Sequence, residues 1–307
     1  MRVAVLCNDR LGIPALQQLL HNNMVQAVGT SDRAPEMIAV MQQITVQSGI
    51  PSQVFTRKNF EAELVKWLEL HCPDVVLVKT FPFRIPASAL TIPVHGFINF
   101  HYAPLPQFRG SNPLFWMIRE GITTGGVAVH RMDERFDTGP LLLQRAVPVS
   151  PEASFGMCVT QLAFAGMEMT IEVLQGLYAG NLKETPQEQK QDRWYGRPKA
   201  TDFFISWITM NSSQVKALVK ACNPWQKGAF VRLKGLTIAI TDISLSEIAV
   251  PPGTLPGTIL HLSPEKGLII ACKDEVALKA EVFFAEEGFF AGERLALFGI
   301  RQGDRFE

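Results

Sequence analysis

The first eighty residues alternate between short apolar runs and amphipathic stretches, and this alternation constrains the fold more than any other feature. Apolar runs rich in β-branched residues predict strands at Arg2–Cys7, Val25–Thr30, Gln53–Phe55 and Asp74–Val78. Helical spacing between them predicts helices at Ile13–Leu20, at Glu36–Gln47 and from a candidate cap at Asn59 to Leu68. Strands that alternate with helices form parallel βαβ units, so we expect an α/β fold with a Rossmann-like, doubly wound sheet.

The pattern changes in the last third of the chain. A polar stretch around residues 183–193 predicts a solvated linker, which we place at residues 186–205. After a predicted helix at Ser213–Ala221, short apolar runs predict strands at Ala229–Val231, Leu236–Ile240, Gly257–Leu260, Gly267–Ala271 and Val276–Phe284. Such strands favour a small β-barrel of the OB-like kind. We therefore expect an α/β domain over residues 1–185 and a barrel domain over residues 206–307.

Composition narrows the class of protein. Lys plus Arg and Asp plus Glu each number 29, and this balance removes the long-range attraction that strongly basic nucleic-acid binders use. The five cysteines are scattered without a C-x-x-C pair, which argues against a disulfide framework or a structural zinc site and fits a reducing cytoplasm. The apolar run Val3–Leu6 is too short for a signal peptide or a membrane span. We expect a cytoplasmic, metal-free protein that does not enter a membrane.

Ligands of doubly wound sheets bind beyond the carboxyl ends of the strands, so the loops after Leu6, Val78 and Asn99 are the candidate site. No glycine-rich dinucleotide or nucleotide-phosphate signature follows the first strand or occurs elsewhere. Asn8 and Arg10, which follow the first strand, are candidate substrate-binding residues.

The richest chemistry lies between Phe97 and Pro140. Asn99 and His101 stand two apart in an extended segment, so both side chains project from one face, and Asp137 follows in a turn sequence. An amide and an imidazolium stabilise a tetrahedral oxyanion, and a carboxylate raises the histidine pKa and helps to remove a proton from an attacking amine. Structural roles compete with this interpretation, because a lone histidine is usually a hydrogen-bonded structural residue and Asn99 and Asp137 also suit turns.

These residues carry a resemblance to a known family. The stretch Asn99–Gly110, then Pro113, Gly121, Gly125, Val127 and Met132–Pro140 resemble the folate-dependent formyltransferases, whose pattern is Asn-x-His, Leu-Pro, Arg-Gly and a later Asp-x-Gly. The family includes methionyl-tRNA, glycinamide ribonucleotide and amino-sugar formyltransferases. Phe81–Pro86 is similar to its folate-pocket loop, and Asn223–Trp225, Gly228–Phe230 and Pro256–Ile259 are similar to its C-terminal barrel domain.

The resemblance implies a catalytic domain that passes the formyl group of 10-formyltetrahydrofolate to an amine. Asn99 and His101 would stabilise the tetrahedral intermediate, while Asp137 would tune His101 and relay the proton. The residues implied to hold the folate are Phe83, Arg84, Ile85, Asp133, Phe136 and Gly139. Those expected to contact the acceptor, besides Asn8 and Arg10, are Tyr102, Arg109 and Gly110.

The sequence motifs predict the reaction more closely than they predict the acceptor molecule. Methionyl-tRNA formyltransferases carry a longer basic loop after the second strand than Ser31–Met37. Members of the family often have Ser-Leu-Leu after the histidine, where this chain has Tyr102–Pro104, so we expect a different acceptor pocket. The stretch Trp194–Pro198 is similar to amino-sugar formyltransferases, although its aromatics also suit packing at a domain junction. We therefore expect a small amine, such as a nucleotide-linked amino sugar or a specialised-metabolite amine, and keep methionyl-tRNA as the alternative.

Two further functions share the residues. A 10-formyltetrahydrofolate hydrolase would use the same three side chains, but the barrel domain argues against it. A non-catalytic folate- or RNA-binding module would be favoured by a missing catalytic residue, and Asn99, His101 and Asp137 are all in place. The sequence leaves open whether the protein is a monomer or a homodimer.

Overall fold

The structure is a computed structural model that describes residues 1–188 and 194–307. The chain forms two compact units. The first comprises Met1–Pro113, Thr124–Pro148 and Val159–Tyr195, and the second comprises Leu114–Thr123, Val149–Cys158 and Gly196–Glu307.

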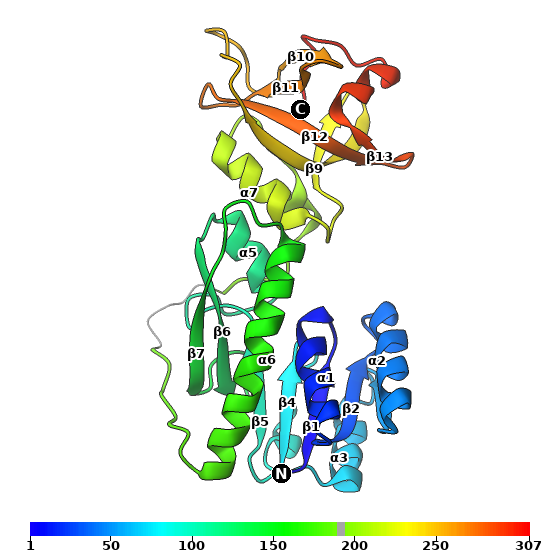
Figure 1. Cartoon of the computed structure of the whole chain (residues 1–307), viewed down its shortest axis with the longest axis vertical. Helices are drawn as coiled ribbons and strands as arrows, with labels where there is room; N and C mark the ends of the chain where they lie inside the picture. Colours follow the sequence, from blue (N-terminus) through cyan, green and yellow to red (C-terminus); the bar gives the residue numbers. More distant parts are fainter. Residues whose placement is uncertain (189–193) are drawn as a thin grey trace. The chain divides into compact units, whose positions relative to one another are not determined.

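The first unit is built on a seven-stranded sheet of order β3-β2-β1-β4-β5-β6-β7 (Figure 1). Its strands are β1 (Val3–Cys7), β2 (Val25–Ser31), β3 (Ser52–Phe55), β4 (Val75–Lys79), β5 (Phe97–His101), β6 (Thr124–Arg131) and β7 (Leu141–Pro148). The pairs among β1 to β5 are parallel, whereas β6 is antiparallel to both β5 and β7. The predicted Rossmann-like sheet is confirmed, and β6 and β7 are strands that the sequence analysis did not predict.

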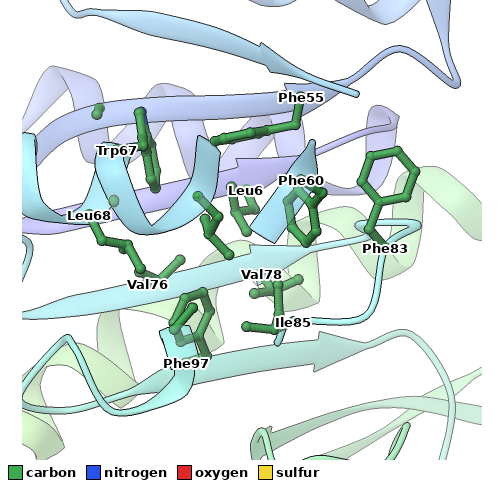
Figure 2. Packing of buried hydrophobic residues seen from close by; sticks show 14 residues of the cluster. Leu6, Phe55, Phe60, Trp67, Leu68, Val76, Val78, Phe83, Ile85 and Phe97 are labelled. Carbon is green, nitrogen blue, oxygen red and sulfur yellow. The ribbon is translucent and has the colours of Figure 1, made fainter. Parts of the chain in front are cut away.

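Helices cover the sheet. They are α1 (Ile13–His21), α2 (Pro35–Ser48), α3 (Phe60–His71), the short α4 (Ala87–Leu90) and, from Val159 onward, α6 (Phe155–Ala179). Strand side chains alternate between faces. Leu6, Val76, Val78 and Phe97 therefore pack on one face against Trp67 and Leu68 of α3, as Figure 2 shows.

Helix α6 is long and apolar enough to cross a membrane by length and composition alone, with a mean hydropathy of 1.3 in its most apolar window. About 44% of that window is buried inside the protein. A Cβ placed on Gly166 would lie 2.9 Å from the ring of Tyr102, so the helix backbone packs tightly against the sheet unit. These contacts are those of a core helix in a globular domain.

The second unit contains an antiparallel sheet, which confirms the predicted change of architecture. Its elements are α5 from Leu114 (Pro113–Arg119), α7 (Ser212–Cys222), β8 (Ala229–Leu233), β9 (Leu236–Ser246), β10 (Ile259–Ser263), β11 (Gly267–Ala271), β12 (Ala277–Ala285) and β13 (Gly288–Ala291). The order is β10-β11-β12-β9-β8, with β13 also on β12. The chain end lies between the two outer strands, because the Ile259 N–H of β10 donates to the Asp304 carbonyl and Glu307 N–H donates to the Arg232 carbonyl of β8.

The segment expected to be a solvated linker is partly built into the first unit. Gln187 and Tyr195 are buried, at 8% and 6% exposure. Tyr195 N–H donates to the Arg109 carbonyl, and Ser111 N–H donates to the Tyr195 carbonyl. The linker interpretation is therefore wrong at these two residues, while residues 189–193 of it lie outside the described residues. The division at residues 185 and 206 also differs from the compact units, because Leu114–Thr123 and Val149–Cys158 belong to the second.

Candidate active site

The site lies where β5 meets β6. Register places Asn99 directly opposite His130. Paired residues point to the same face of a sheet, so the Asn99 Nδ2 and His130 Nε2 atoms approach to 3.0 Å. His101, two residues along β5, projects from that face as well. The predicted pair thus stands at the end of a strand, joined by a histidine that the sequence analysis did not single out.

Asp137 lies between the two histidines. Its Oδ1 atom is 3.5 Å from His101 Nδ1 and 3.7 Å from His130 Nε2. Its Oδ2 atom accepts a hydrogen bond from the Gly110 N–H at 3.0 Å. Residues from the β5 strand, from the loop after it and from the β6–β7 loop therefore converge on one carboxylate, and the three predicted catalytic side chains belong to one cluster.

The backbone partners assign a proton to each imidazole. His101 Nε2 is 2.7 Å from the carbonyl oxygen of Phe108, so Nε2 carries a proton and Nδ1 faces Asp137. His130 Nδ1 is 2.9 Å from the Arg131 carbonyl oxygen, so Nδ1 donates and Nε2 accepts from Asn99. This chain fixes the amide of Asn99 with its NH₂ toward His130, which leaves its second N–H and its Oδ1 for other partners.

Burial and charge act in opposite directions on the cluster. Burial lowers the pKa of His101 below its usual value, and the Asp137 charge and the Phe108 carbonyl offset this only in part. The expectation that the carboxylate raises the pKa of this histidine is confirmed in direction, but desolvation outweighs the effect of Asp137, so the net pKa is lowered. Burial opposes ionisation of Asp137, but its imidazole neighbours and the Gly110 N–H lower the pKa of its carboxyl to about 2. The resting pair is a carboxylate beside a neutral imidazole.

Comparison with known proteins identifies the family. The formyl transferase family model matches residues 1–174, and that of the formyl transferase C-terminal domain matches residues 198–287. The chain belongs to the formyl transferase family. This confirms the resemblance on which Asn99, His101 and Asp137 were chosen.

Relatives of this formyltransferase include enzymes with different names. The methionyl-tRNA formyltransferase of Aromatoleum aromaticum is 32% identical over 76% of this chain and 72% of its own. An N-formyltransferase from Helicobacter canadensis, in complex with folinic acid and dTDP-3-aminofucose, superimposes with a TM-score of 0.70 at 14% identity over 91% of this chain and 98% of its own. HypX from Aquifex aeolicus, in complex with tetrahydrofolic acid, gives a TM-score of 0.66 at 20% identity; the alignment covers 98% of this chain but only 48% of HypX. The two structures show a shared fold.

The loop Phe83–Ile85, which is expected to hold the folate, is anchored by its own side chains. Phe83 and Ile85 are buried in the core beside Phe60 and Val78 (Figure 2), while Arg84 is exposed. The side chains of Phe83 and Ile85 are therefore turned into the core and leave little surface for a ligand. Their burial fixes the loop instead, and the loop backbone is the part left to pair with a ligand.

Asp133, Phe136 and Gly139, the other residues expected to hold the folate, belong to the loop that carries Asp137. Asp133 accepts hydrogen bonds from the Arg135 N–H and the Thr138 hydroxyl. Gly139 is packed so closely that a Cβ would lie 1.9 Å from the Arg131 carbonyl oxygen. Phe136 is 45% exposed and 6.3 Å from the half-exposed ring of Trp194. Of these residues, only the Phe136 side chain is presented to solvent as a surface.

The residues expected to contact the acceptor are divided between surface and interior. Asn8 Oδ1 accepts from the Thr30 hydroxyl, the Ser31 hydroxyl and the Ser31 N–H, so it ties the ends of β1 and β2 together. Arg10 is exposed. Tyr102 is buried and donates its hydroxyl to the Leu11 carbonyl, which gives it a packing role and places it away from a ligand surface.

Arg109 and Gly110, the remaining pair, contact the Asp137 loop itself. Arg109 Nε donates to the Asp137 carbonyl at 3.0 Å, and Gln187 Nε2 donates to the same oxygen at 3.1 Å. Gln187 was missed because a single glutamine in a polar stretch carries no signal of burial. His130 had one, which the sequence analysis did not use: it follows the apolar run Val127–Val129, a pattern that indicates a buried strand before the Asp137 turn. Among the described residues, no cluster of His, Cys, Asp and Glu could hold a metal ion.

Proposed function

We propose that this formyltransferase moves the formyl group of 10-formyltetrahydrofolate to the primary amine of a small acceptor, with Asn99, His101 and Asp137 as the catalytic residues. The observation that carries the proposal is the convergence of these side chains, with His101 Nδ1 3.5 Å from Asp137 and Asn99 held by His130. The folate ligands in the two structural neighbours support the choice of donor.

The reaction requires charge to be stabilised and one proton to be moved. The amine nitrogen bonds to the formyl carbon, and the carbonyl oxygen becomes an oxyanion that the free N–H of Asn99 stabilises. Neutral His101 accepts the amine proton at Nδ1, where Asp137 stabilises the resulting imidazolium. The imidazolium adds positive charge near the oxyanion. The carbon–N10 bond then breaks, and the proton is delivered to N10 of the folate.

A small acceptor is favoured by the link between β2 and α2. Strand β2 ends at Ser31 and α2 begins at Pro35, so the connection is short and contains one basic residue, Arg33. Binding of tRNA depends on several Lys or Arg contacts to phosphates, and the chain as a whole has no net charge to supply the attraction. The nucleotide-linked amino sugar in one structural neighbour is of the chemical class proposed.

Methionyl-tRNA is the second candidate, because the 32% identical relative from Aromatoleum aromaticum is a methionyl-tRNA formyltransferase. If tRNA is the acceptor, its recognition uses surfaces other than a long β2–α2 loop. Its binding should then weaken steeply with added salt, in contrast with a small nucleotide sugar.

The test is formyl transfer from 10-formyltetrahydrofolate with initiator methionyl-tRNA and a panel of nucleotide-linked amino sugars in parallel. Formate release without an acceptor measures hydrolysis. Turnover of an amino sugar that exceeds tRNA formylation by at least about tenfold in kcat/KM supports the proposal. Efficient formylation of tRNA alone would mean that the acceptor is methionyl-tRNA and not a small amine. Formate release alone would mean that the reaction is hydrolysis and not formyl transfer.

A further inference from the structure

Gln187 is a buried polar side chain in contact with the loop that carries Asp137. Its Oε1 atom accepts from Arg109 Nη2 at 2.7 Å and from Arg109 Nε at 3.2 Å. Its Nε2 atom donates to the carbonyls of Asp137 at 3.1 Å and Gly139 at 2.7 Å. One amide thus satisfies a guanidinium and two backbone carbonyls, and only one orientation of that amide does so.

The backbone that Gln187 contacts needs such support. Asp137 has a φ of +55°, in the left-handed region that costs free energy for residues other than glycine. Its carbonyl is bonded by both Gln187 and Arg109, while its carboxylate is bonded by the Gly110 N–H. Bonds at the carbonyl and at the carboxylate together set where the Oδ1 atom points.

Gln187 is itself anchored. Two residues earlier, Thr185 and Leu141 exchange both backbone hydrogen bonds at 2.8 Å, so this segment is paired with the start of β7. The β6–β7 loop that contains Asp137 therefore has one fixed neighbour on the segment after α6. A buried amide on a paired segment is a rigid support for a catalytic loop.

We propose that Gln187 is a positioning residue of the reaction, which holds the backbone at Asp137 so that the carboxylate faces His101. The inference rests on the proposed function, since it requires Asp137 to act in catalysis. In this proposal Gln187 contacts neither the folate that donates the formyl group nor the amine that receives it. It acts only through Asp137.

The experiment is a double-mutant cycle between Gln187→Met and Asp137→Asn in the full-length enzyme. Met keeps the volume of Gln187 and removes its donor and acceptor, and Gln187→Glu is a second variant that keeps the acceptor for Arg109 and loses the donor to the carbonyls. Glu188→Gln, at the exposed neighbouring position, is the matched control. Turnover is measured with 10-formyltetrahydrofolate and either initiator methionyl-tRNA or dTDP-3-aminofucose, whichever is formylated, and thermal unfolding verifies the fold of each variant.

We expect Gln187→Met to lower kcat roughly 10- to 100-fold with KM for the folate within about twofold, because a small misplacement of a catalytic group has effects of this size. In the Asp137→Asn background the same substitution changes kcat by less than about twofold. Gln187→Glu reproduces the loss, and Glu188→Gln does not.

Equal losses in both backgrounds would overturn the inference, because Gln187 would then act independently of Asp137. Unchanged kcat in a folded Gln187→Met enzyme would overturn it too. Near-normal turnover by Asp137→Asn alone overturns the proposed function, and the inference with it. A large loss in Asp137→Asn with none in either Gln187 variant rejects only the inference.

Discussion

The two faces of strand β5 both bury ionisable groups, and they do so with opposite consequences. On one face, Asn99 and His101 meet Asp137 and His130. On the other, Phe100 lies under the amine of Lys79, whose Nζ is 2.8 Å from the ring centroid and donates to the Thr170 hydroxyl at 2.6 Å. Lys79 and Phe100 are partners in the β4–β5 register.

The difference lies in what is left unsatisfied. Lys79 is fully buried under α6, where Thr170 and the Gly166 carbonyl accept its hydrogens. In the other cluster, the amide of Asn99 keeps an N–H unused by His130, and His101 Nδ1 faces a carboxylate 3.5 Å away without a proton between them. A buried group is poised to react when its surroundings satisfy all its hydrogen bonds only after it gains or loses a proton. Lys79 lacks that property, because its hydrogen-bond partners are already in place.

The largest expected effect is a difference in turnover between substitutions on the two faces of β5. Asp137→Asn should lower turnover by roughly 10²- to 10⁴-fold, because the imidazolium loses its counter-charge, and His101→Ala should do the same. Lys79→Met, the matched change on the opposite face, should leave turnover within about twofold. Single-turnover kinetics at saturating folate measures all three. A comparable loss in Lys79→Met would remove the distinction between the faces.

The next effect concerns the oxyanion. Asn99→Ala should lower kcat roughly 10²- to 10³-fold, the usual cost of removing one preorganised donor. Binding of the folate should stay nearly intact, which isothermal titration with tetrahydrofolate checks. A variant that lost folate affinity but kept kcat would make Asn99 a binding residue instead.

His130 tests the chain of hydrogen bonds behind Asn99. His130→Phe keeps a planar ring but removes the Nε2 acceptor, so the Asn99 amide is free to rotate. We expect a fall in kcat of about tenfold, the size of one hydrogen bond. If His130→Phe is as damaging as Asn99→Ala, His130 has a direct part in the chemistry that the tautomer assignment does not give it.

The same contrast explains how far sequence predicts this protein. The strands β1 to β4 follow short apolar runs that the sequence reveals locally, and Asn99, His101 and Asp137 stand in a motif with fixed spacing. Gln187 lies in a polar stretch whose composition indicates exposure, and its burial depends on Arg109, 78 positions away. The pKa of His101 depends on burial, which residue type alone does not give. Long-range pairing is the part that a single sequence does not encode locally.

The smallest effect is a pH dependence of stability on the face of the sheet that carries Lys79. Burial lowers the pKa of Lys79 well below its usual 10.5. Between the folded and unfolded pKa values the unfolded chain binds the extra proton, so the free energy of unfolding must rise with pH and level off above about 10.5. Lys79→Met should lose this rise, which is at most about 1.4 kcal/mol per pH unit. Urea unfolding of both proteins at several pH values from neutral to mildly alkaline measures the difference, in which the titrating groups that do not interact with Lys79 cancel. Parallel curves would mean that Lys79 keeps its proton in the core, where its amine contacts the neutral groups Thr170, Gly166 and Phe100.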